Sequence, residues 1–79
     1  MNHERTVRQL MREFDQLFGF KTSLKQTTGA GIFLEGQGGQ IASLGDSGYN
    51  ALLSPRDQEA ICENFGLDAR LLGLNPGVN

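Results

Sequence analysis

The chain has 79 residues, of which 38% are hydrophobic and 20% are charged, and its net charge is −2. A chain of this length builds one core, because it buries only roughly 60% of its unfolded surface on folding. We therefore expect one small soluble domain, ordered from about residue 4 to about residue 74. The single cysteine excludes an intramolecular disulfide. No run of about 18 apolar residues suggests a membrane span, so the cytoplasm is the simplest compartment.

Charge is distributed unevenly along the chain. Residues 1–25 hold five basic and three acidic side chains, whereas residues 26–79 hold two basic and six acidic ones. The whole chain is therefore too acidic for a nucleic-acid binder of the usual basic kind. Its first segment is nevertheless net positive, so that part of the surface can attract an acidic partner.

The strongest periodic signal lies near the N-terminus. Apolar residues recur there at intervals of three and four, which predicts a helix over residues 4–18 with one core-facing side: Val7, Leu10, Met11, Phe14, Leu17 and Phe18. We expect the helix to start at Asn2 or His3, with Glu4 in its positive first turn. Gly19 suits the left-handed conformation that ends a helix, with Phe20 folding back toward Phe14.

Three strands follow in the predicted order. Residues 20–27 alternate between two sets of side chains, as a strand with one solvated face does. A glycine-bearing break at residues 29–31 leads into an apolar run at residues 32–34, and a second break at residues 36–39 leads into residues 40–44. The simplest arrangement is an antiparallel three-stranded meander that packs against the apolar face of the N-terminal helix.

A second helix is marked by its start. Ser54 is a good N-cap, Pro55 suits the first helical position, and Asp57 stands where a capping-box acid belongs. We expect an inward face that ends before Gly66 and consists of Ala60, Ile61, Cys62 and Phe65. One further turn is expected over residues 69–72. The predicted fold class is α+β, with an N-terminal helix, an antiparallel three-stranded meander, and a C-terminal helix packed on one face of the sheet.

The sequence contains no complete catalytic or metal-binding set. Gly45-Asp46-Ser47-Gly48 resembles the sequence around the nucleophile of chymotrypsin-like serine proteases, but the only histidine, His3, lies near the chain start. The glycine-bearing breaks lack the lysine and hydroxyl of a phosphate-binding loop. His3 and Cys62 alone do not complete a tetrahedral metal site. We therefore expect no enzyme activity, no cofactor and no metal.

The polar face of the first helix is the best candidate for a binding surface. Arginine suits contacts with carboxylates and phosphates, because its planar group donates two parallel hydrogen bonds. The predicted contact residues are Arg5, Arg8, Arg12, Gln16, Lys21 and Lys25. The alternative is an ordinary solvated face, in which Glu4 pairs with Arg8 and Asp15 pairs with Arg12. The acidic second helix is the other candidate contact surface.

The order of helix, glycine-broken strands and helix between residues 7 and 67 is marked by five short segments: Gln9-Leu10-Met11, Phe18-Gly19-Phe20, Thr28-Gly29-Ala30-Gly31, Ser54-Pro55 and Asn64-Phe65-Gly66-Leu67. In this layout the chain resembles the small HicA-type toxins, which implies a double-stranded-RNA-binding-like fold. The catalytic histidine of that family follows a glycine-serine pair at the strand break, whereas this chain has Gly29-Ala30-Gly31 there. The resemblance therefore implies the fold without the ribonuclease activity.

Two further segments resemble known architectures. Residues 58–74 resemble a helix-turn-helix, with Cys62 followed by Gly66 four residues later. Only about one helical turn follows Asp68, and Arg70 is its only basic residue, which disfavours a reader of the major groove. Residues 10–44 are similar to the start of type III secretion chaperones, in which a helix ending in Phe-Gly-Phe precedes alternating strands.

These observations favour a non-catalytic interaction protein. We expect an inhibitor or adaptor that binds and occludes a protein partner, of the kind that phages and mobile elements encode, for example against a host defence. The alternative function is nucleic-acid binding on a HicA-like or helix-turn-helix scaffold. A homodimer that completes the small core is a third arrangement.

Overall fold

The computed structural model describes residues 3–29, 31–45 and 48–75 of the chain. Its principal elements are α1 (Val7–Phe18), β2 (Thr22–Thr27), β3 (Gly31–Gly36), β4 (Ile41–Gly45) and α2 (Pro55–Phe65). Three short elements accompany them: β1 (Arg5–Thr6), β5 (Leu52–Leu53) and the 3-10 helix η1 (Ala69–Leu72). The predictions that concern Asn2, Ala30, Asp46 and Ser47 lie outside the described residues.

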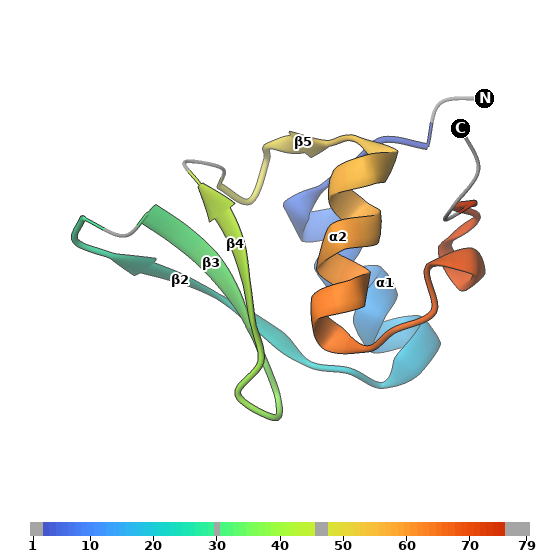
Figure 1. Ribbon diagram of the computed structural model, residues 1–79, viewed down its shortest axis with the longest axis horizontal. Helices are drawn as coiled ribbons and strands as arrows, with labels where there is room; N and C mark the ends of the chain where they lie inside the picture. The colour runs from blue at the N-terminus through green and yellow to red at the C-terminus, as the bar shows by residue number, and fades with distance from the viewer. Residues whose placement is uncertain (1–2, 30, 46–47, 76–79) are drawn as a thin grey trace.

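The expected α+β fold is confirmed. Strands β2, β3 and β4 form an antiparallel sheet in that order, and Leu24, Leu34 and Ala42 are paired across it. Both helices lie on the same side of this sheet (Figure 1). Leu34 and Ala42 of this row are buried, because they point toward the helices. The pairing of β3 with β4 is irregular near the start of β3, where the register shifts between Ile32 and Phe33.

The predicted start of α1 is wrong. Thr6 is the N-cap, its side chain accepts a hydrogen bond from the Gln9 backbone N–H, and the Gln9 side chain accepts one from the Thr6 backbone N–H. This reciprocal pair satisfies two amides that a helix start leaves free, so the helix begins after Thr6 and not near Glu4. Arg5 and Thr6 instead pair with β5 in a second, two-stranded sheet that the periodicity did not predict.

The end of α1 and the aromatic core agree with the sequence. Gly19 has a left-handed backbone with φ of 62°. Phe20 folds back, and its ring meets that of Phe14 edge to face at 6.5 Å, while Phe65 of α2 meets Phe14 at 5.9 Å. Edge-to-face pairs of this kind add to the stability that burial supplies. Leu17 is the exception on the predicted apolar face: it is 47% exposed, because the sheet and α2 cover the line through Phe14 and not the flank that Leu17 occupies.

Helix α2 begins and ends as predicted. The Ser54 side chain accepts a hydrogen bond from the Asp57 backbone N–H, Pro55 is the first helical residue, and Gly66 ends the helix with a left-handed backbone. The predicted inward face is correct except for Ala60, which is exposed. Gln58, which was not among the predicted inward residues, is buried and 0% exposed. No helix in the described part of the chain is long and apolar enough to cross a membrane.

Candidate functional site

The structure separates Arg5 from the other arginines of the predicted binding surface. Arg8 and Arg12 are exposed on α1, one helical turn apart, whereas Arg5 precedes the helix in β1. The Arg5 guanidinium donates hydrogen bonds through Nη1 to Gln58 Oε1 at 2.8 Å and through Nη2 to the Leu72 carbonyl oxygen at 2.7 Å. Its donors are therefore engaged within the fold.

Gln58 completes this connection from inside the core. Its Nε2 group donates hydrogen bonds to the carbonyl oxygens of His3 at 2.7 Å and Leu53 at 3.1 Å. Because a buried amide is costly unless its groups are paired, Gln58 fixes the chain segments around it. It holds β1, β5 and α2 together, and Arg5 extends the connection to η1. We call Arg5 and Gln58 the closing pair.

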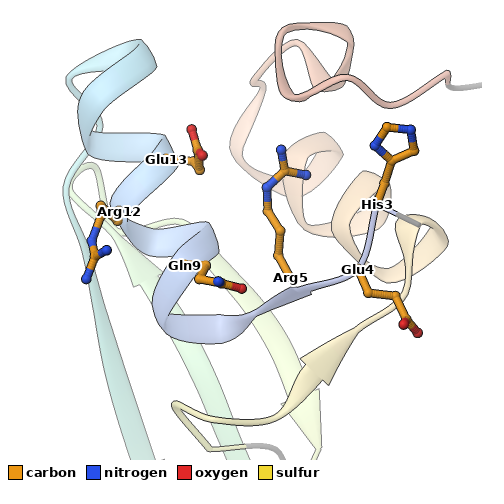
Figure 2. A pocket seen from close by; sticks show the side chains of 6 residues that line it. All are labelled: His3, Glu4, Arg5, Gln9, Arg12 and Glu13. Atoms are coloured by element: carbon orange, nitrogen blue, oxygen red, sulfur yellow. The ribbon is translucent and has the colours of Figure 1, made fainter. Parts of the chain in front are cut away.

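A polar hollow of about 310 Å³ lies beside the closing pair (Figure 2) and is lined by His3, Glu4, Arg5, Gln9, Arg12 and Glu13. In Figure 2, Gln9 and Glu13 extend from α1 toward the space beside Arg5, whereas Arg12 turns to the other side of the helix. The lining contains both acidic and basic side chains, so the charge of the hollow is mixed. None of the described lining residues carries a hydroxyl or thiol that could act as a nucleophile.

A second hollow lies on the other side of Arg12 and has a different character. It measures about 340 Å³ and is lined by Arg8, Met11, Arg12, Asp15, Lys21, Thr22 and Tyr49. The Arg8 guanidinium carbon stands 4.7 Å from the centre of the Tyr49 ring, a cation–π contact that supports the side chain from one side. We call this cavity the arginine–tyrosine hollow.

The charges of the arginine–tyrosine hollow are not balanced. Lys21 Nζ lies 2.7 Å from Asp15 Oδ1, which neutralises one basic and one acidic group. Arg8 and Arg12 form no ion pair with a carboxylate in the described chain, and the solvated pairs considered from the sequence, Glu4 with Arg8 and Asp15 with Arg12, are not among its ion pairs. The hollow therefore has two guanidinium groups available for an external anion.

The walls of this hollow add two features to its charge. Met11 and Tyr49 supply apolar surface, and Tyr49 is 41% exposed. The Thr22 hydroxyl is buried in the wall without a hydrogen-bond partner in the described residues. Sequence reasoning missed Tyr49, because its position beside α1 depends on the backbone hydrogen bond from the Arg8 N–H to its carbonyl oxygen at 2.9 Å.

The remaining predicted contact residues lie apart from this hollow. Gln16 is exposed farther along α1 and does not line it. Lys25 lies in β2, where its Nζ is 3.9 Å from Glu35 Oε1 on the neighbouring strand. Of the six predicted residues, the structure brings Arg8, Arg12 and Lys21 together in one hollow, and Arg5 shares the other hollow with Arg12.

Metal-ligating side chains do not gather in the described part of the chain. No group of three or more His, Cys, Asp or Glu residues there is placed to hold a metal ion. Cys62 is a free, buried cysteine, and burial raises the pKa of its thiol from 9.0 to about 11. A thiol in this state is a poor nucleophile near neutral pH, because the thiolate is the reactive form.

No protein-family model matches the chain, and neither a curated protein nor a solved structure shows significant similarity to it. The resemblance to HicA-type toxins therefore stays a prediction from the layout of the sequence. The chemistry of the arginine–tyrosine hollow is the feature from which we infer a function.

Proposed function

We propose that the protein is a non-catalytic inhibitor or adaptor that binds an acidic segment of a protein partner in the arginine–tyrosine hollow. The observation that carries this proposal is the pair Arg8 and Arg12, one helical turn apart and without an ion pair to a carboxylate in the described chain. Carboxylates accept two parallel hydrogen bonds from a guanidinium. An acidic segment can therefore engage both arginines.

The shape and composition of the hollow favour a protein segment over a bare anion. Its Met11 and Tyr49 walls can cover an apolar side chain next to the acidic ones, and aromatic and arginine side chains are enriched where protein interfaces gain most of their affinity. Because the Tyr49 ring braces Arg8, less side-chain freedom is lost when a partner binds. We place this function in the cytoplasm, where the thiol of Cys62 would stay reduced.

Nucleic-acid binding is the competing function, because the same arginines can contact phosphates. Binding to nucleic acid would also need phosphate contacts from Lys21 and Lys25. Each of these lysines lies in an ion pair with a carboxylate. The net charge of −2 further weakens attraction to a polyanion. A salt titration with duplex RNA and duplex DNA separates the two functions, since phosphate-driven binding should be strong in about 50 mM salt and fall steeply above it.

The test is affinity capture from a lysate of the source organism with four forms of the protein. The unaltered chain should recover a stoichiometric protein partner, and Arg8→Glu or Arg12→Glu should lose it. Arg56→Glu is the matched control, because it makes the same charge change at an exposed position on α2 outside the hollow. Recovery of no partner, or equal recovery by all four proteins, would contradict the proposal. Duplex binding that Arg8→Glu abolishes would replace it with the nucleic-acid function.

A further inference from the structure

The outer edge of β4 is an unpaired strand edge beside a groove. In the described residues, β4 pairs only with β3, and it is the strand of the meander nearest to α2 (Figure 1). The Gly36 N–H donates to the Gln40 carbonyl oxygen at 2.7 Å. Because hydrogen-bonded and non-hydrogen-bonded pairs alternate along antiparallel strands, the backbone groups of Ile41 and Ser43 then point away from β3. They are open to another strand.

This edge lacks the charged residues and prolines that often prevent strand addition, and the register shift opposite Ile32 and Phe33 lies beyond Ser43. Exposed edges of natural sheets are usually protected by lysine or other charged residues, or by proline. The opposite edge, β2, carries Lys25, whereas β4 has neither a charged residue nor a proline. Ile41 on β4 is also 55% exposed. An unprotected edge with an exposed aliphatic side chain is suited to being covered by a partner.

The groove beside this edge indicates the chemistry of that partner. It measures about 230 Å³, lies between β4 and α2, and is lined by Ser43, Leu44, Leu53, Asp57, Ala60, Ile61 and Asn64. Ala60, exposed against the sequence expectation, belongs to its wall. Asn64 is turned back on its own helix, where its Nδ2 donates to the Ala60 carbonyl oxygen at 3.0 Å. Among the described residues of the lining, Asp57 is the only charged one.

We propose that an extended segment of a protein partner adds to β4 as a fourth strand, with an aliphatic side chain in this groove and a lysine or arginine beside Asp57. Backbone hydrogen bonds to Ile41 and Ser43 supply the affinity, and the groove supplies the side-chain preference. Among the residues that the structure describes, the groove shares no lining residue with the arginine–tyrosine hollow. The inference therefore stands or falls independently of the proposed function.

The experiment uses the full chain and a short capped probe peptide in which valine alternates with threonine and lysine. Titration followed by amide NMR should shift the signals of Ile41 and Ser43 and slow their hydrogen exchange. Two N-methylated versions of the peptide, each blocked at alternate amides, distinguish strand addition from side-chain binding. The version blocked on the protein-facing side should bind at least about tenfold more weakly, because it loses two or more hydrogen bonds. The other version should retain affinity.

Protein variants test the groove. Ala60→Gln should fill it and weaken peptide binding, with little effect on folding because Ala60 is exposed. Asp57→Asn should weaken binding by about threefold, as expected for one ion pair at an interface rim. Glu63→Gln is the matched control, because it also removes a carboxylate from α2 but lies outside the groove. It should bind normally.

Three results would overturn this inference. Equal affinity of the two N-methylated peptides would show that the edge amides are not used. Peptide-induced shifts confined to Arg8, Arg12 and Tyr49 would place the contact at the other hollow. A dimer in sedimentation without peptide, converted to a monomer by Ser43→Pro, would assign the edge to a second copy of this chain.

Discussion

Replacing Arg5 by alanine should destabilise the fold, although Arg5 belongs to the predicted binding surface. The substitution removes two hydrogen bonds from a charged donor, of 2.8 Å to Gln58 Oε1 and of 2.7 Å to the Leu72 carbonyl oxygen. Both oxygen atoms then lack this donor. Hydrogen bonds to charged groups contribute about 1.5 to 3 kcal/mol each. Arg5 is only partly buried, so water restores part of that loss. We expect the free energy of unfolding to fall by about 2 to 3 kcal/mol.

The control for this prediction is Arg8→Ala, which removes the same side chain from the helix surface. Its loss is the contact with the Tyr49 ring, which is worth about 0.5 to 1 kcal/mol at an exposed site. Thermal unfolding followed by circular dichroism should show the midpoint of Arg5→Ala lowered by roughly 10 to 20 °C. The midpoint of Arg8→Ala should fall by a few degrees. Equal midpoints for the two variants would refute the structural role of the closing pair.

Three further predictions concern the core, a turn and the thiol. Phe14→Ala should cost about 3 to 5 kcal/mol in urea unfolding, because the ring is fully buried; a loss below about 1 kcal/mol would contradict the packing. Gly31→Ala should destabilise far more than Gly39→Ala in the same assay. Both glycines have positive φ, but only at Gly31 would a Cβ approach a backbone oxygen, that of Gly45, to 2.8 Å. For Cys62, whose pKa burial raises from 9.0 to about 11, the unfolded chain loses its proton first as pH rises. Its contribution to stability is therefore complete below about pH 9 and is lost as pH rises to about 11. Cys62→Ala should show a shallower decline over that range, and identical slopes would argue against a buried neutral thiol.

Local signals predicted the parts of the fold that depend on neighbouring residues. The Ser54-Pro55 start of α2, the Gly19 end of α1 and the meander were each readable, because capping, helix termination and hairpin formation involve residues a few positions apart. Thr6 and Gln9 also form a readable capping box, which the longer apolar periodicity obscured. Strands β1 and β5 have two residues each, too few to produce a periodic pattern.

The closing pair could not be predicted in the same way. Gln58 is a polar residue in a polar stretch, and its burial depends on groups from distant parts of the chain: the Arg5 guanidinium and the carbonyl oxygens of His3 and Leu53. The predicted binding surface could not be completed from the sequence either. Arg8 and Arg12 were predicted from helical spacing, but Tyr49 joins them only through tertiary structure.

The hydrogen bond from Arg5 to Leu72 joins residues 67 positions apart, and this separation orders events during synthesis. The segment that contains Arg5 leaves the ribosome before η1, whose Leu72 is made 67 residues later. Helix α1 and the meander can assemble beforehand, but Arg5 gains its hydrogen bond to Leu72 only when η1 has emerged. A nascent chain stalled before η1 would therefore present a loosely held N-terminal segment, which is the kind of site that proteases cut first.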